Sequence, residues 1–390
     1  MTSAVAIETG HRTALLDWLA CAVGGSDQPA ARAARSLGDG LTERIAAAGT
    51  AGHVLDYDDT YLPGLAHLSA PVAPAALLVG DAVGASVGDV LAAFTKGFET
   101  MARLTAANHP ELRARGWHPT SVGGVVGAAT AAGALLDLDA EQMRHAVGLA
   151  LLQASGLRAA FGSDGKSLQV GLAAAAGATA ARLAARAATA SAGVATGDGG
   201  FEQAYGARWV EPEGTDAIAA VRENWIKAYP CCLQTHGAIE AAAAARSAGA
   251  RTARDIAVTV HPVSLHAAAL GPDVADGLQA KFSIPYLTAF TLLHGPPRLS
   301  SFEGVDEDAR RLAHRVEVRT DTGLLESAAL LDVDGERAAE VEAALGSPAR
   351  PMDAAQLRAK LEELAGHRLD GVLDDPDAPV AGVLDAALLR

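Results

Sequence analysis

Long alanine runs broken by single glycines constrain the fold of this chain more than any other feature. One of them, at residues 168–184, reads LQVGLAAAAGATAARLA. Half of all residues are hydrophobic but only 4% are aromatic, so the apolar content is mostly alanine, leucine and valine. Because alanine is the best helix former, we expect a mainly α protein.

The length of the chain and a change in its residue pattern near residue 226 predict two domains. At 390 residues the chain exceeds the size at which a single hydrophobic core usually stops growing. After about residue 226, segments 255–263 and 314–320 alternate apolar and polar residues as strands do. We therefore expect an all-helical domain and a smaller α+β domain.

Charge and cysteine content exclude several classes of partner. Thirty-one basic against 46 acidic residues give a net charge of −15, which disfavours nucleic acid and anionic membranes. Cys21, Cys231 and Cys232 are too few and too badly spaced for a zinc or iron–sulfur site. Because the chain also shows no signal-peptide pattern and no uninterrupted apolar span, we expect a soluble cytoplasmic protein.

The stretch from residue 55 to 72, LDYDDTYLPGLAHLSAPV, concentrates polar groups at an element boundary. It contains Asp56, Asp58, Asp59, Thr60 and His67, and the Pro-Gly pair inside it interrupts any helix. Such a cluster can face a cleft. The alternative is that Asp59 or a serine only caps the next helix and that the other acids are solvated.

Three basic side chains are expected at helix starts. His67 precedes a helix capped by Ser69, and His118 precedes one capped by Thr120. Lys166 opens a third helix, where a cation opposes the helix dipole unless an anion is bound there. Each alone also fits a surface residue, but together they predict a pocket for a polycarboxylate.

Several motifs, in order along the chain, resemble the MmgE/PrpD family, which includes 2-methylcitrate dehydratase, cis-aconitate decarboxylase and iminodisuccinate epimerase. The resemblance covers nearly the whole chain, and five ordered motifs are more specific than any one. The motifs are DYDDT with His67 seven residues later, WHPT at 117–120, GKSLQVGLAA at 165–174, KAYPCCLQTH at 227–236 and KFSIPY at 281–286.

The resemblance implies a fold and an assembly. It implies an all-helical domain from residues 1–226 and 367–390, an α+β lid from residues 227–366, and an active site between them in a homodimer, without metal or cofactor. The chain departs from the family where it reads His67-Leu68-Ser69 instead of H-P-S. It also looks shortened before residue 12 and compressed before Ala51, which bears on dimer packing and substrate identity.

The resemblance also assigns site residues, and their chemistry agrees with it. Proton removal next to a carboxylate needs a base of near-neutral pKa and donors for the developing enolate. Lys166 can anchor a carboxylate, Asp56 can orient an imidazole, and His118 on its stiff helix entry is the better candidate for proton transfer. The implied catalytic set is Asp56, Thr60, His67, His118, Lys166, His236 and Tyr286.

The function expected from these residues is a metal-independent hydro-lyase resembling 2-methylcitrate dehydratase. A cis-aconitate-type decarboxylase and an iminodisuccinate-type epimerase are the alternatives within the same fold. The DYDD motif also fits a class II terpene cyclase, but such sites need aromatic walls that this chain lacks. A Mg²⁺-dependent haloacid-dehalogenase-type phosphatase and a non-catalytic binding protein are further alternatives. Against the last, three of the five lysines, at 166, 227 and 281, fall in the motifs.

Overall fold

The computed structural model describes residues 7–211, 219–250 and 255–389 of the chain. The chain divides into two compact units. The helical unit comprises Met1–Val54, Asp58–Ile226 and Ala354–Arg390, and the mixed unit comprises Leu55–Tyr57 and Lys227–Asp353. The mainly α fold class expected from the alanine content is confirmed, and within the described residues the strands form one small sheet and one short pair.

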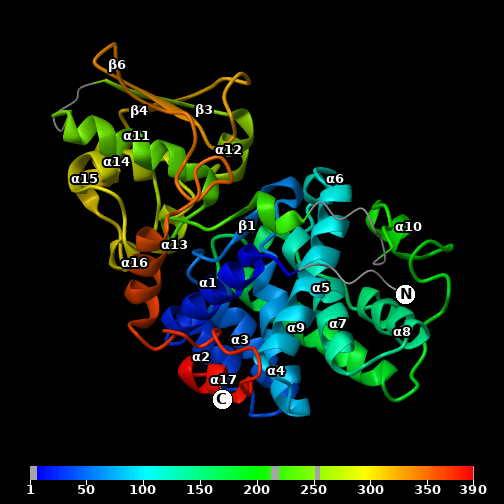
Figure 1. Cartoon of the computed structure of the whole chain (residues 1–390). Helices are drawn as coiled ribbons and strands as arrows, with labels where there is room; N and C mark the ends of the chain where they lie inside the picture. Colours follow the sequence, from blue (N-terminus) through cyan, green and yellow to red (C-terminus); the bar gives the residue numbers. More distant parts are fainter. Residues whose placement is uncertain (1–6, 212–218, 251–254, 390) are drawn as a thin grey trace. The chain divides into compact units, whose positions relative to one another are not determined.

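The helical unit contains α-helices of up to 21 residues together with short 3₁₀ helices, which are labelled η (Figure 1). Its two short strands, β1 and β2, pair antiparallel with Thr60 opposite Trp225. In chain order the elements are α1 (Thr9–Gly25), α2 (Pro29–Arg35), α3 (Leu41–His53), β1 (Thr60–Tyr61), η1 (Leu62–Gly64), α4 (Ser69–Val83), α5 (Val87–Ala107), α6 (Glu111–Ala114), α7 (Pro119–Leu135), α8 (Ala140–Leu151), η2 (Arg158–Ala160), α9 (Gly165–Ala184), α10 (Phe201–Tyr205), η3 (Ala220–Glu223), β2 (Asn224–Trp225), α16 (Ala354–Ala365) and α17 (Ala381–Ala386).

Small residues let the central helices of this unit approach closely. A Cβ added to Gly49 on α3 would lie 2.9 Å from the Cα of Gly171 on α9. A Cβ on Gly177 would meet the backbone of α7. Such separations leave no room for a side chain, so glycine at these positions fixes how α3, α7 and α9 cross. These three helices end or begin at the functional residues described below.

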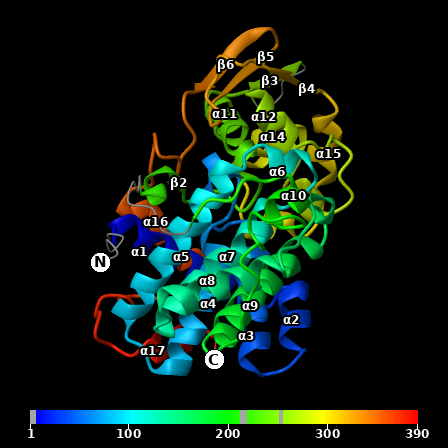
Figure 2. The ribbon, with the colours of Figure 1, turned by 90° about the vertical axis from the view of Figure 1, so that its right-hand side faces the viewer.

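The mixed unit is a four-stranded sheet with helices on one face. Strand order is β4-β3-β5-β6, with β3 parallel to β4 and antiparallel to β5. Helices α11 and α14 lie beneath the sheet in both views (Figures 1 and 2). The elements are η4 (Leu233–Thr235), α11 (His236–Ser247), β3 (Ile256–Val260), α12 (Pro262–Ala267), α13 (Gly277–Ala280), α14 (Ile284–His294), η5 (Leu299–Phe302), α15 (Glu307–Ala313), β4 (Val316–Thr320), β5 (Ala329–Val333) and β6 (Glu336–Val341).

The domain boundary near the C-terminus differs from the expected one. The sequence placed it at residue 366, but α16 belongs to the helical unit, which resumes at Ala354. The physical reason is a buried ion pair, in which Lys360 Nζ of α16 lies 2.6 Å from Asp17 Oδ1 of α1. Both side chains are almost fully excluded from solvent, so separating α16 from α1 would leave a buried charge uncompensated.

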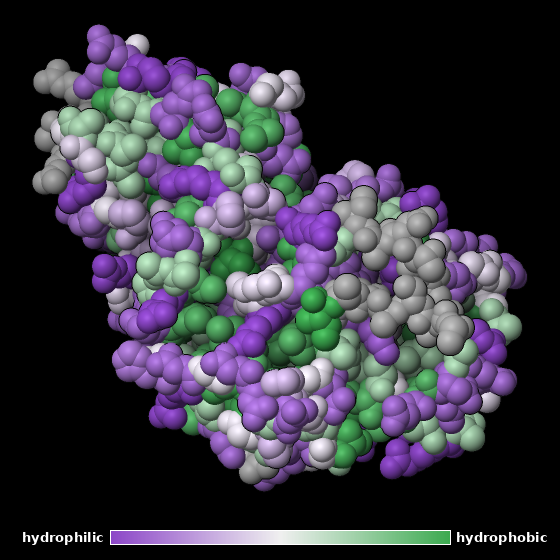
Figure 3. All heavy atoms as spheres, in the orientation of Figure 1, coloured by the Kyte–Doolittle hydropathy of each residue, from purple (hydrophilic) through white to green (hydrophobic). Residues whose placement is uncertain are grey.

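Hydrophilic side chains are interspersed with hydrophobic ones over the face in Figure 3. None of the helices in the described part of the chain is both long and apolar enough to cross a membrane.

Substituting Gly171 by alanine should destabilise the helical unit. The new Cβ would meet the Ala46 carbonyl oxygen and would lie 2.8 Å from the Thr50 backbone nitrogen, neither of which can rotate away. We expect the free energy of unfolding to fall by about 1–3 kcal/mol, measured by denaturant unfolding. The control is Gly382→Ala, where a Cβ meets nothing within 4 Å. Equal stability of both variants would contradict the close crossing of α3 and α9.

Candidate active site

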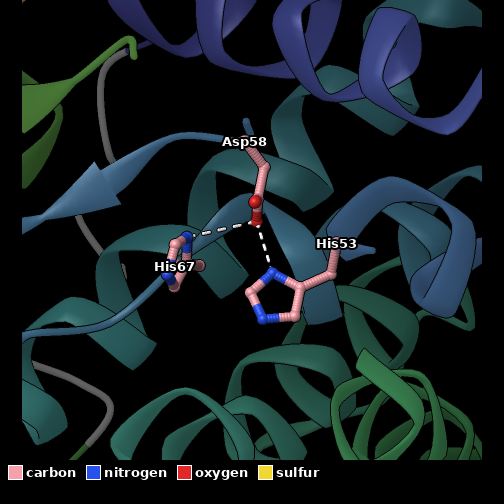
Figure 4. A group of neighbouring side chains, drawn as sticks. All are labelled: His53, Asp58 and His67. Atoms are coloured by element: carbon pink, nitrogen blue, oxygen red, sulfur yellow. Dashed lines mark hydrogen bonds and ion pairs between the residues drawn. The ribbon is translucent and has the colours of Figure 1, made fainter. Parts of the chain in front are cut away.

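One buried carboxylate oxygen in the helical unit is shared by two imidazoles (Figure 4). Asp58 Oδ2 lies 2.8 Å from His53 Nδ1 and 3.2 Å from His67 Nδ1. The two rings meet edge to face with their centroids 4.6 Å apart. Because an ionised carboxylate only accepts hydrogen bonds, both Nδ1 atoms donate to it. Each Nε2 of a neutral imidazole is then left with its lone pair.

Burial and these contacts act against each other on the pKa values. Burial opposes ionisation of Asp58, but the two histidines outweigh it and hold the pKa of this carboxyl well below its usual range. Burial lowers the pKa of His53 to about 4, and the positive charge of Lys166 adds to this lowering. His53 is therefore neutral at pH 7, while His67 keeps 11% of its side chain exposed and is the member of the pair that a ligand can reach.

Local structure explains why these residues meet. His53 ends α3, and the chain turns back so that Asp58 follows five residues later. His67 stands just before α4, where its backbone N–H donates to Thr120 Oγ1 at 3.1 Å. Thr60 on β1 lies with its Oγ1 3.5 Å from His67 Nδ1. Thr120 of α7 thus holds the backbone of His67, and Thr60 of β1 lies beside its ring.

Asp59, which the acidic motif places beside Asp58, has a structural role. Its carboxylate accepts hydrogen bonds from the Ser69 backbone N–H (3.2 Å), from Ser69 Oγ (2.8 Å) and from Asn224 Nδ2 (2.8 Å). Burial, with the neighbouring charge of Asp58, raises its pKa to about 7. These three donors tie the start of α4 and strand β2 to the segment that carries Asp58.

His118 forms a second part of the site, with an aromatic ring and two cations beside it. The His118 ring stacks 6.2 Å from that of His53 and meets Phe161 edge-on at 5.0 Å. Lys166 Nζ and the Arg113 guanidinium lie 5.6 and 5.9 Å from the centre of the Phe161 ring. Burial lowers the pKa of His118 well below its usual value, and the nearby basic groups, among them Lys166 and Arg113, lower it further.

The helix starts differ from the expected caps in two places. Ser69 is the first residue of α4, and its hydroxyl binds Asp59 instead of capping the helix. His118 itself occupies the N-cap position of α7, because Thr120 lies inside the helix and uses its hydroxyl to hold His67. Both hydroxyls are buried, so they satisfy internal groups of the site. Lys166 is the second residue of α9, as the sequence predicts.

The remaining predicted residues belong to the mixed unit. Asp56 has a left-handed backbone (φ 55°). Lys227 Nζ lies 3.3 Å from Asp56 Oδ1 and donates a hydrogen bond to the Asp56 carbonyl oxygen at 2.9 Å. Lys281 Nζ donates to the carbonyl of Leu55 at 2.6 Å. Two motif lysines thus hold the segment from Leu55 to Tyr57, and Asp56 is an ion-pair partner in this structure.

His236 and Tyr286 are both buried in the same unit. His236 is the first residue of α11, and its ring meets that of Tyr229 edge-on at 5.1 Å. Tyr286 Oη accepts a hydrogen bond from the Asp306 backbone N–H at 2.9 Å. Their catalytic roles, and that of Asp56, stay predictions from the resemblance.

Three members of the site were missed by sequence reasoning. His53 lies outside the polar stretch singled out in the sequence, although a histidine five residues before Asp58 is itself a signal. Arg113 and Phe161 lie outside the quoted motifs. Only the packing of Phe161 against His118 and the two cations brings them to the site.

The Asp58 group could also hold a metal ion. His53, Asp58 and His67 each offer one ligand atom, and these atoms all lie within 4.8 Å of one another. Binding a cation through the two Nδ1 atoms would require both Nδ1 protons to leave, because a ligating imidazole nitrogen must be unprotonated. In the described arrangement these protons are used in hydrogen bonds to Asp58. The absence of a metal requirement stays a prediction.

Fold and site together define a mainly helical protein with a histidine–carboxylate group suited to proton transfer next to anion-attracting charges. The chain belongs to the MmgE/PrpD family: residues 42–210 match the MmgE/PrpD N-terminal domain and residues 229–380 the MmgE/PrpD C-terminal domain. The resemblance stated from the motifs is therefore confirmed.

Curated relatives add a narrower similarity. The chain is 31% identical to the cis-aconitate decarboxylase of Homo sapiens over 51% of its own length and 43% of that protein. It is 31% identical to that of Aspergillus terreus over 48% of its length and 41% of that protein. It is 29% identical to the cis-aconitate decarboxylase-like protein oryM of Aspergillus oryzae over 58% and 55%. The matches thus span roughly half of these relatives or less.

The shared carboxylate predicts a pH dependence of stability. Burial lowers the pKa of His53 from 6.5 to about 4, so between these values the unfolded chain binds a proton that the folded chain excludes. This contribution is complete above pH 6.5 and is lost as the pH falls toward 4. His53→Gln keeps a donor for Asp58 and should make stability less steep in this window, by about 1.4 kcal/mol per pH unit.

The measurement is urea unfolding at a series of pH values between 4 and 6.5. The control is His367→Gln, which removes an exposed imidazole from the same unit. An unchanged slope in His53→Gln, or the same change in both variants, would contradict the buried neutral state of His53.

Proposed function

We propose that this protein is a lyase that decarboxylates a small unsaturated polycarboxylate of the cis-aconitate type. The observation that carries the proposal is the combination, within one unit, of the His67–Asp58–His53 group with the cations Lys166 and Arg113. Cations attract carboxylates, and the imidazoles can move a proton. The cis-aconitate decarboxylases among the curated relatives support the same reaction.

The proposed reaction converts cis-aconitate into itaconate and CO₂. In cis-aconitate, the bond between the methylene carbon and its carboxylate breaks, and CO₂ leaves. The freed electron pair forms a new double bond to the central carbon. The original double-bond pair moves toward the distal CH carbon as a dienolate on the neighbouring carboxylate and then takes one proton at that carbon. The product is itaconate, one proton is consumed, and no oxidant or reductant is required.

We assign the proton delivery to His67. Its Nδ1 faces Asp58 at 3.2 Å, so its Nε2 points to the opposite side of the ring, and its side chain is the partly exposed one of the pair. The ionised Asp58 stabilises the imidazolium form of a histidine, as carboxylates do in triads. Lys166 and Arg113 stabilise the carboxylate on which negative charge develops.

A hydro-lyase resembling 2-methylcitrate dehydratase, the main expectation from the sequence, takes second place. It would use the same basic group to remove a proton next to a carboxylate, but it must also protonate a leaving hydroxyl. The curated relatives carry the name of the decarboxylase. An epimerase needs only proton removal and return. The polycarboxylate substrate and the homodimer belong to this proposal as well.

The deciding experiment offers each substrate separately to the purified full chain. Cis-aconitate, 2-methylcitrate and iminodisuccinate are followed by ¹H NMR. We expect itaconate to appear from cis-aconitate with release of one CO₂. Turnover of 2-methylcitrate alone would replace the proposal with the dehydratase, and turnover of iminodisuccinate alone with the epimerase.

Lys166 should act mainly in substrate binding. Removing a charged partner of a carboxylate costs about 1.5–3 kcal/mol, so Lys166→Met should raise KM about ten- to hundredfold. A smaller fall in kcat is expected if the anchor also orients the reacting carbon. The control is Lys96→Met, an exposed lysine of α5 in the same unit. A KM equal to that of the control would remove Lys166 from the binding site.

Activity should not depend on a metal ion. We expect that exhaustive EDTA treatment followed by gel filtration leaves kcat unchanged, because His53 and His67 use their Nδ1 protons to bind Asp58. Loss of turnover that returns with Mg²⁺ or Zn²⁺, but not with buffer, would show that the Asp58 group is a metal site.

A further inference from the structure

Gln169 on α9 makes an unexplained contact with the site. Its Nε2 lies 2.7 Å from His118 Nδ1. It stands three residues after Lys166 on the same helix, so both side chains project from neighbouring positions of one face. The motif at 165–174 includes this glutamine, but neither the sequence nor the proposed reaction gives it a role.

The orientation of the Gln169 amide is fixed by backbone groups of Leu157. The Leu157 N–H donates to Gln169 Oε1 at 2.9 Å, and Gln169 Nε2 donates to the Leu157 carbonyl at 3.2 Å. A flipped amide would place two donors together and two acceptors together, losing both bonds. The –NH₂ group therefore faces His118.

The backbone of His118 is tied to the same segment. Its N–H donates to the carbonyl of Gly156 at 3.0 Å, and Trp117 pairs with Leu157. Gly156 has φ +111°, and a Cβ there would lie 2.5 Å from Ser121 and 3.3 Å from Gln169 Oε1. The absence of a side chain at Gly156 thus permits the close approach of Gln169 to the His118 ring. The ring and the amide are therefore held in a fixed relative position.

We propose that Gln169 is a positioning residue that holds His118 as the neutral tautomer with its proton on Nε2. An amide –NH₂ has no acceptor for a ring N–H, so His118 Nδ1 must carry the lone pair. Both the Nδ1–H tautomer and the imidazolium would direct a proton at the –NH₂ group. His118 then presents a hydrogen-bond donor from Nε2.

This assignment gives the imidazoles opposite polarity. His53 and His67 donate from Nδ1 to Asp58 and keep the lone pair on Nε2, whereas His118 keeps it on Nδ1. His118 therefore suits a hydrogen bond to the carboxylate oxygen on which the dienolate develops, and His67 suits proton transfer. The sequence favoured His118 for proton transfer, and the contact with Gln169 revises that role. The catalytic part of this inference rests on the proposed function.

The tautomer can be observed without any activity. Protein labelled with ¹⁵N-histidine is studied at neutral pH by long-range ¹H–¹⁵N correlation, which identifies the protonated ring nitrogen. His118→Gln assigns the signal by its disappearance. We expect the His118 proton on Nε2 in the wild type. A proton on Nδ1 there overturns the proposal.

Gln169→Glu tests the cause. A carboxylate accepts from a ring N–H, so the His118 proton should move to Nδ1 and kcat should fall about 10²-fold, the usual effect of losing one oxyanion donor. The control is Gln153→Glu, which changes an exposed glutamine of the same unit. An unmoved proton in Gln169→Glu would contradict the proposal.

If Gln169→Glu does not fold, Gln169→Met provides the same test, because it removes the donor and should give a mixture of both tautomers. A single Nε2–H form in Gln169→Met would overturn the role of Gln169. A moved proton with unchanged kcat would support the role of Gln169 in setting the His118 tautomer but would show that His118 takes no part in the reaction. Absence of turnover on cis-aconitate by the wild type, with the expected tautomer, would fault only the proposed function.

Discussion

The buried carboxylate of Asp58 is the constraint on which the rest of the site depends. Removing an ionised carboxylate from water costs several kcal/mol, and that cost is offset here by two imidazole N–H groups on one oxygen. The interaction fixes the Nδ1–H form of His53 and His67 and so decides where their lone pairs lie. The Nε2 of His53 is excluded from solvent, yet without this residue Asp58 would lose one of its two imidazole partners.

Close helix packing makes this arrangement possible. His53 ends α3 one turn after Gly49, and Gly49 faces Gly171 of α9, the helix that carries Lys166 in its first turn. The alanine and glycine content that predicts helices therefore also sets the distance between the histidines and the lysine. Larger side chains where α3 and α9 cross would move His53 away from Lys166. The small residues of these helices therefore set the geometry of the site.

The sequence predicts the helices and individual site residues better than it predicts the contacts that these residues make. The mainly α class, the α+β segment after residue 226, and Lys166 at a helix start follow from local patterns. The caps at Ser69 and Thr120 were wrong because tertiary groups, Asp59 and His67, compete for those hydroxyls. The roles of His53 and Gln169, and the place of α16 in the helical unit, depend on contacts between residues distant in sequence. No local sequence pattern reports such contacts.

The central claim is that Asp58 acts through His67, and a double-mutant cycle on kcat tests it most directly. Asp58→Asn, His67→Gln and the double variant are compared with wild type on cis-aconitate, after circular dichroism shows that all four fold. Residues that act as one unit give non-additive losses. The account predicts that the double variant is no slower than His67→Gln alone. Losses that multiply in the double variant would mean that Asp58 and His67 act independently and would contradict it.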